Sequence, residues 1–151
     1  MTQVGRDTGQ QAGGFVSSAP QSNPAGGEPT YRTGNTAIAL YSLMSYLHRT
    51  RESEPDAPAI RQAADQAADW LLRQQLSTGP MAGLLTGGWD QAGVEPGTRL
   101  PFASTEHNLD AWHSLSRAGQ VLNCPRCTAA ANSLQDAILA ILWDSSGGVF
   151  L

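Results

Sequence analysis

Ser104-Thr-Glu-His-Asn-Leu-Asp-Ala-Trp112 begins the most sharply divided helix that this sequence predicts. Ser104 or Thr105 can cap its start, and Gly119 is expected to stop it after about Ala118. At about 100° per residue, ionisable side chains fall on one side of this helix and apolar side chains on the other. The ionisable side consists of Glu106, His107, Asp110 and His113, and the apolar side of Leu109, Ala111, Trp112, Leu115 and Ala118. The helix is therefore amphipathic, with its ionisable groups gathered on one face.

The polar side of this helix has the composition of an acid–base site. Glu106 and Asp110 are like charges one turn apart, which costs about 0.2–0.5 kcal/mol on an exposed helix, although the helix dipole offsets part of that cost. Each imidazole has a carboxylate one turn away that can fix its tautomer or share a proton. Such a cluster suits general acid–base catalysis. It could equally orient sugar hydroxyls. Metal ligation is a third option, because His, Asp and Glu are suitable donors, but the spacing is not His-Glu-x-x-His. The remaining alternative is that these residues form the solvated side of a surface helix.

Three further helices are expected around this one. The first runs from about Asn35 to Arg49 and is so dense in apolar residues that both of its faces should be buried. The second, from about Ala57 to Leu76, is amphipathic and has Asp56 as its cap. The fourth runs from Pro125 to about Trp143. Four helices joined in pairs predict an all-α fold of antiparallel α-hairpins.

The connections differ in length between the two ends of this array. Residues 1–33, an irregular arm or loop, and residues 77–103, rich in glycine and proline, precede the first and third helices. Those two helices should run parallel, so both long connections lie at one end and the short ones lie at the other. Long loops over helix N-termini are the expected place for a binding site. Residues 34–151 would then form the α/α-hairpin domain.

Composition excludes several classes of function. The 151 residues suit one domain. The formal net charge is −4 and the nine basic residues are scattered arginines, so we expect neither nucleic acid nor a membrane as a partner. No apolar run approaches the roughly 18 residues of a spanning helix, and the first residues lack the apolar segment of a secretory signal. The sequence assigns no compartment.

Cys124 and Cys127 form a Cys-Pro-Arg-Cys sequence at the start of the fourth helix. Such a pair can be a redox centre or half of a zinc site. A zinc ribbon needs a second pair, and a thioredoxin-like motif needs a βαβ context that the alanine-rich helical pattern does not provide. We interpret the pair as a helix-entry turn that contains two thiols.

Four segments, taken in order, resemble a known superfamily of bacterial proteins. They are Thr33-Gly-Asn-Thr-Ala-Ile-Ala-Leu40, Ala68-Asp-Trp-Leu-Leu72, Gly87-Gly-Trp-Asp90 and Ser104-Thr-Glu-His-Asn-Leu-Asp-Ala-Trp112. They are similar to successive hairpins of the six-hairpin glycosidase-like superfamily, whose members form an (α/α) toroid. The resemblance implies inner and outer rings of helices and a carbohydrate-processing site at the rim, lined by Asn35, Glu106, His107 and Asn108. The loop lengths select the same rim independently.

The resemblance extends over about two of the six hairpins. A full toroid needs about twelve helices of 10–14 residues, and this sequence supplies four. We therefore expect an arc of a toroid, as a fragment of a longer protein or as an open-ended remnant. An arc leaves apolar flanks uncovered, and such flanks imply a partner or self-association.

The expected function is carbohydrate processing of the glycoside hydrolase type on an oligo- or polysaccharide, without a cofactor or metal. Glu106 is the candidate acid, and Asp90 or Asp110 is the opposing carboxylate. Hydrolysis needs carboxyl groups about 5–5.5 Å apart for retention or about 6.5–9.5 Å apart for inversion. The candidate substrate-binding residues are Tyr31, Asn35, Trp89, His107, Asn108 and His113.

Other readings stay open for the same residues. Trp89 offers a flat apolar face to a sugar ring, whereas Asn35 could instead be a helix cap. A non-catalytic helical-hairpin module that binds a saccharide or a protein partner would use the same rim. A terpenoid-cyclase-like toroid shares the ring plan, but its aspartate-rich cluster is missing from this sequence.

Overall fold

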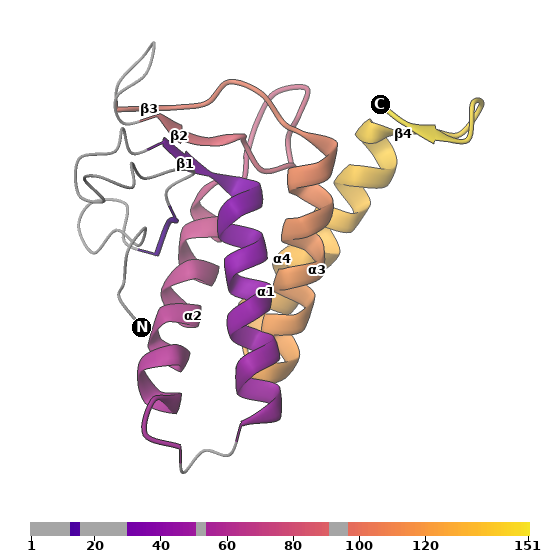
Figure 1. Ribbon diagram of the computed structural model, residues 1–151. Helices are drawn as coiled ribbons and strands as arrows, with labels where there is room; N and C mark the ends of the chain where they lie inside the picture. The colour runs from indigo at the N-terminus through magenta and orange to yellow at the C-terminus, as the bar shows by residue number, and fades with distance from the viewer. Residues whose placement is uncertain (1–12, 16–29, 51–53, 91–96) are drawn as a thin grey trace.

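Helices dominate the computed structural model, which describes residues 13–15, 30–50, 54–90 and 97–151. The α-helices of this part are α1 (Thr33–Arg49), α2 (Ala57–Arg73), α3 (Thr105–Val121) and α4 (Pro125–Ala137), and α4 continues as a π-helix, η1 (Ile138–Leu142). The mostly helical character of the predicted all-α fold is therefore confirmed, with four α-helices in the described part, whereas a purely α-helical fold is not, because short strands accompany the helices (Figure 1). Most of the arm predicted for residues 1–33 lies outside the described residues.

Two small antiparallel sheets, which the sequence did not predict, accompany the helices. The first contains β1 (Thr30–Arg32), β2 (Gly88–Asp90) and β3 (Thr98–Arg99) in that order, and the second pairs β4 (Trp143–Asp144) with β5 (Val149–Phe150). Gly88 lets β1 and β2 approach closely, because a Cβ atom there would lie 1.9 Å from the carbonyl oxygen of Tyr31. The first sheet thus joins the segment before α1 to the long connection before α3.

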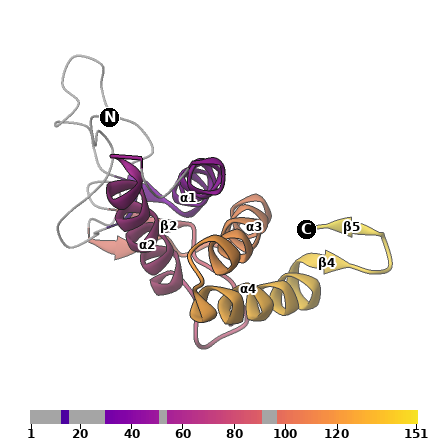
Figure 2. The same cartoon turned by 90° about the horizontal axis from the view of Figure 1, so that it is seen from below.

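The helices form two rows, with α1 and α3 side by side in one row and α2 and α4 in the other (Figure 2). α1 and α3 run in the same direction, and α2 and α4 run back the opposite way (Figure 1). α1 packs against both α2 and α3, while α3 packs against α4. The starts of α1 and α3 consequently lie at the same end of the bundle, beside the three-stranded sheet.

Apolar side chains from both rows fill the space between them. The largest completely buried ones are Trp70, Leu40, Met44, Leu71, Leu84, Leu85, Leu115 and Leu134. Full burial of one such aliphatic side chain stabilises a fold by about 1.5–3 kcal/mol. Residues 13–15 add to this packing, since Gly14 lies against the Trp70 ring and the Phe15 N–H donates to Thr36 Oγ1 at 3.0 Å. The core therefore lies between the rows and leaves the outer side of α1 open.

The prediction that both faces of the first helix are buried is wrong. Ile38, Tyr41 and Tyr46 are 56%, 41% and 38% exposed, whereas Leu40 and Met44 are completely buried. The spacing of the exposed residues places them on one side of α1, turned away from the core. Apolar density shows that a helix could be covered on all sides, but it does not supply the neighbour that would cover it.

Helix ends also differ from the sequence expectations. α1 begins at Thr33, so Asn35 lies in its first turn and is not the cap, and Asp56 precedes α2 without a side-chain capping bond. α2 ends at Arg73 rather than near residue 76. α3 passes through Gly119 and ends before Asn123, whose φ is +55°. Gly119 instead allows α4 to come close, because a Cβ atom there would lie 2.3 Å from Thr128 Oγ1.

Cys124 and Cys127 are joined in a disulfide, which corrects the expectation of two thiols. The bond lies in the turn between α3 and α4, at the end of the bundle opposite to the three-stranded sheet (Figure 1). The predicted position of the pair at the entry to the fourth helix is confirmed, since α4 begins at Pro125.

Candidate functional site

A chain of hydrogen bonds fixes the start of α1 beside the segment that leads into α3. The backbone N–H of Thr33 donates to the Gly87 carbonyl at 3.1 Å, and its hydroxyl donates to the Thr86 carbonyl at 2.6 Å. The N–H of Gly87 in turn donates to the Phe102 carbonyl at 2.6 Å. Two glycine-rich connections are thereby bound to one another. They hold the N-termini of α1 and α3 at one end of the bundle.

Ser104 and Asn108 fix the first turn of α3. The Ser104 hydroxyl caps the helix by accepting from the His107 N–H at 3.4 Å, as predicted. The Asn108 amide oxygen accepts from the Leu85 N–H at 2.7 Å, and its amide nitrogen donates to the carbonyls of Leu85 and Ser104 at 3.1 and 2.8 Å. The Asn108 side chain is completely buried. It holds the connection before α3 in place. The resemblance implied instead that Asn108 lines an open cleft.

His107 fills the contact between the first turns of α1 and α3. A Cβ atom on Gly34 would lie 2.5 Å from His107 Cδ2, so only glycine fits beside this ring. Burial lowers the pKa of His107 below its usual 6.5, Arg32 adds to the lowering, and Glu106 and Asp110 oppose it. His107 Nδ1 is buried without a hydrogen-bond partner. The imidazole therefore favours its neutral form and keeps one ring nitrogen uncommitted.

Asp110 lies one turn further along α3, in surroundings that disfavour its charged form. Burial raises the pKa of Asp110 above its usual 3.8, and the charge of Glu106 raises it further, while His107 and His113 oppose the shift. Glu106 itself is exposed at the start of the helix. The two carboxyl groups are thus placed in different surroundings on one helix face.

An aromatic side chain of α1 extends this ionisable face sideways. The rings of Tyr41 and His113 have centroids 4.7 Å apart and are tilted by 34°. A shallow cavity of about 240 Å³ opens beside them, lined also by Ser116, Arg117 and Gln120. We use the term α1–α3 face for the adjoining surface made by Asn35, Ile38 and Tyr41 of α1 and Glu106, His107, Asp110 and His113 of α3.

The structure brings only some of the predicted site residues to this face. Glu106, Asp110, His107, His113 and Asn35 belong to it. Tyr31 is only 6% exposed and belongs to the hydrophobic core, and Trp89, its partner across the β1–β2 pair, is half-buried against that core. Asp90 lies in β2 and is 8% exposed. The choice between Asp90 and Asp110 therefore favours Asp110 as the carboxylate that shares a face with Glu106.

Sequence reasoning missed three members of this arrangement, Gly34, Ile38 and Tyr41. Tyr41 follows Asn35 and Ile38 at intervals of three, so a helical projection could have placed it on the same side. Gly34 carried no such signal, because its importance comes from the ring of His107 on another helix.

No group of three or more His, Cys, Asp or Glu side chains in the described part of the chain is arranged to hold a metal ion. Among the helices of that part, none has both the length and the apolar character required to cross a bilayer. No protein-family model, curated protein or solved structure matches this chain.

Proposed function

We propose that the α1–α3 face is an acid–base site for carbohydrate processing, carried by an arc of an (α/α) toroid. Support for the arc comes from the two rows of helices, in which parallel α1 and α3 would be inner helices and α2 and α4 outer helices (Figure 2). The two long connections meet at the starts of α1 and α3, where a toroid of this kind would carry its rim.

The chemical proposal rests on one observation: two ionisable groups on the α1–α3 face have pKa values shifted in opposite directions. Asp110 has a raised pKa and His107 a lowered one, both chiefly because of burial. Titratable groups perturbed in this way are more frequent at functional sites than elsewhere. An acid that keeps its proton longer, next to an exposed second carboxylate, matches the requirement of glycoside hydrolysis.

On the basis of these environments we propose roles that differ from those expected from the sequence. Asp110 is the general acid, because its surroundings favour the protonated carboxyl group, and Glu106 is the base or nucleophile. Residues one turn apart on a helix have Cβ atoms about 5–6 Å apart, which suits two carboxyls that act on one glycosidic bond. The Tyr41 and His113 rings would receive a sugar ring on a flat apolar surface.

The test is hydrolysis of a panel of oligosaccharides, which is measured by the release of reducing ends. We expect Asp110→Asn and Glu106→Gln each to lower kcat/KM by about 10²–10⁴-fold, the usual contribution of a general acid or base. The matched control is Asp65→Asn on the exposed side of α2, which should retain full activity. Turnover that is unchanged in both site variants would remove this face from the mechanism.

A second candidate function is a non-catalytic module that binds a saccharide or a protein through the same face. The observation that favours it is the exposed apolar row of α1, which includes Ile38, Tyr41 and Tyr46. In that case titration calorimetry with oligosaccharides would detect binding without turnover. Tyr41→Ala would abolish that binding, whereas Asp110→Asn would leave it intact.

The arc proposal also accounts for apolar side chains near β4 and β5. Exposed large hydrophobic residues gather there, namely Leu139, Trp143, Val149, Phe150 and Leu151. Such a surface is typical of an uncovered flank that associates with another unit. Sedimentation velocity over a range of concentrations would test this, because a chain that remains monomeric at every concentration does not pair its flanks.

A further inference from the structure

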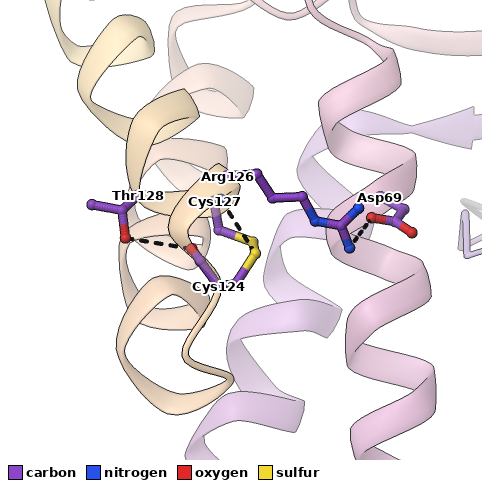
Figure 3. The surroundings of a disulfide bond; sticks show 5 residues. All are labelled: Asp69, Cys124, Arg126, Cys127 and Thr128. Atoms are coloured by element: carbon purple, nitrogen blue, oxygen red, sulfur yellow. Dashed lines mark hydrogen bonds and ion pairs between the residues drawn. A yellow bond between two sulfur atoms is a disulfide. The ribbon is translucent and has the colours of Figure 1, made fainter.

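The disulfide between Cys124 and Cys127 is not used by the proposed carbohydrate site. It lies at the opposite end of the bundle from the starts of α1 and α3, in the turn that enters α4 (Figure 1). Figure 3 shows its surroundings, which include Arg126 and the α2 residue Asp69. Its position therefore calls for a separate explanation.

The two cysteine residues differ in burial. Cys127 is completely buried and belongs to the hydrophobic core, whereas Cys124 is only partly buried. Cys124 is also the N-cap of α4, and its Sγ accepts from the backbone N–H of Cys127 at 3.2 Å. N–H groups at a helix start favour a thiolate over a thiol. Of the two, Cys124 is the less buried residue, and its sulfur is the one placed to carry negative charge.

The turn has other bonds that hold its shape without the disulfide. The Cys124 N–H donates to the Gly119 carbonyl at 3.2 Å, and the Cys124 carbonyl accepts from the N–H groups of Cys127 and Thr128 at 3.0 and 3.2 Å. The disulfide links residues only three positions apart. Because the stabilisation from a disulfide increases with the length of the loop that it closes, this bond restrains little of the unfolded chain. The bond is therefore not needed to join distant parts of the fold.

Arg126 lies between the two cysteines in sequence but turns away from their sulfurs. Its Nη2 atom pairs with Asp69 Oδ1 at 2.6 Å, so the side chain extends across to α2 (Figure 3). The stabilisation available to a Cys124 thiolate thus comes from the start of α4 and not from the guanidinium group. This distinction provides a control variant, because Asp69→Asn removes the carboxylate that pairs with Arg126 and leaves the bond from the Cys127 N–H to Cys124 Sγ in place.

We propose that Cys124 and Cys127 form a reversible redox pair that exchanges with external thiols, with Cys124 as the reacting sulfur. A thiolate attacks Cys124 Sγ, the bond between the two cysteine sulfurs breaks, and Cys127 leaves as a thiolate that takes up a proton. A second external thiol then attacks the mixed disulfide and releases Cys124. Two electrons pass to the protein, and two external thiols become one external disulfide.

The first test is equilibration of the whole oxidised chain with mixtures of reduced and oxidised glutathione at about pH 7, a common cellular thiol pair. Acid quenching, alkylation and mass measurement give the reduced fraction. We expect it to rise from less than a tenth to more than nine tenths across the mixtures, equally from either direction, with the circular dichroism spectrum unchanged. Asp69→Asn should follow the same curve. A disulfide that yields to millimolar glutathione only in denaturant would overturn the proposal.

The second test distinguishes the two sulfurs. In the reduced wild-type chain, limiting iodoacetamide should modify Cys124 at least about tenfold faster than Cys127, as peptide mapping would show, because thiolate character and exposure both favour Cys124. Cys127→Ser should accumulate a mixed disulfide with glutathione at Cys124, and Cys124→Ser should accumulate at least about tenfold less at Cys127. Equal rates in the wild type, or faster reaction of Cys127, would contradict the assignment even if a serine variant fails to fold.

Discussion

The two faces of α3 differ in what surrounds their polar groups. Asn108 is completely buried and its side chain bonds to the backbone of Leu85 and Ser104, while Glu106, two positions earlier, is exposed on the α1–α3 face. Both residues belong to the same short segment, Ser104–Trp112, at the start of α3. One short motif can thus combine a residue that holds a loop with residues that offer chemistry. A motif match alone does not separate these roles, but substitutions can.

Asn108→Ala should produce the largest effect if the inner face of α3 is structural. The variant leaves the N–H and carbonyl of Leu85 without their side-chain partner inside the protein. Unsatisfied buried groups of this kind cost about 1–3 kcal/mol each, so we expect a loss of about 2–4 kcal/mol in the free energy of unfolding. Urea denaturation followed by circular dichroism would measure it. Asn35→Ala, on the exposed α1–α3 face, is the matched control and should change stability by less than about 0.5 kcal/mol; equal losses in both would remove the distinction.

Gly34→Ala should have a smaller effect on stability than Asn108→Ala. It tests the close contact between the first turn of α1 and His107 of α3. The new methyl group would lie 2.5 Å from His107 Cδ2. Overpacking typically costs about 1–3 kcal/mol, and the higher helix propensity of alanine returns up to about 1 kcal/mol. We therefore expect a net loss of about 1 kcal/mol by urea denaturation. In a His107→Ala background the same change should become stabilising; a loss that persists there would mean that His107 is not the obstacle.

Much of the helical framework could be predicted from periodicity. The polar and apolar sides of α3, its Ser104 cap and the start of α4 at Pro125 all follow from local patterns that need no knowledge of distant neighbours. The strands could not be predicted, because β1 and β2 have three residues each and carry no recognisable period. The exposed side of α1 was also missed, since an apolar pattern does not report whether a neighbour is present.

The candidate site was predictable to a lesser degree, for a similar reason. Helical spacing alone predicts that Glu106, His107 and Asp110 lie on one side of the helix. Spacing could not show that Asn108 is held by the backbone of Leu85, 23 positions away. Nor could it show that burial would perturb Asp110 and His107. The properties that depend on non-local packing were therefore the ones that the sequence left open.

The pH dependence of stability offers a finer test of the exposed face. Because the pKa of His107 is lowered in the folded chain, the unfolded chain binds more protons between that lowered pKa and 6.5. The free energy of unfolding should rise with pH through this window, and the partial exposure of the ring keeps that rise small. The raised pKa of Asp110 acts in the opposite direction, with stability lost as pH rises from 3.8 through the raised value. His107→Gln should remove the pH dependence of the free energy of unfolding in the first window, and Asp110→Asn should remove it in the second. Unchanged slopes would contradict the environments described for these two side chains.

The smallest expected effect separates burial from charge at His107. Glu106 raises the pKa of His107 while burial lowers it, and burial dominates. Neutralising Glu106 removes the opposing contribution, so Glu106→Gln should move the midpoint of the His107 ring-proton titration, followed by nuclear magnetic resonance, to a lower pH. Glu54→Gln alters an exposed carboxylate just before α2 and should leave that midpoint in place. A midpoint that rises in Glu106→Gln would mean that Glu106 does not act on His107 as a neighbouring negative charge. Glu106 and His107 would then be electrostatically independent, and this part of the α3 face would lose the coupling that distinguishes it from an ordinary solvated helix side.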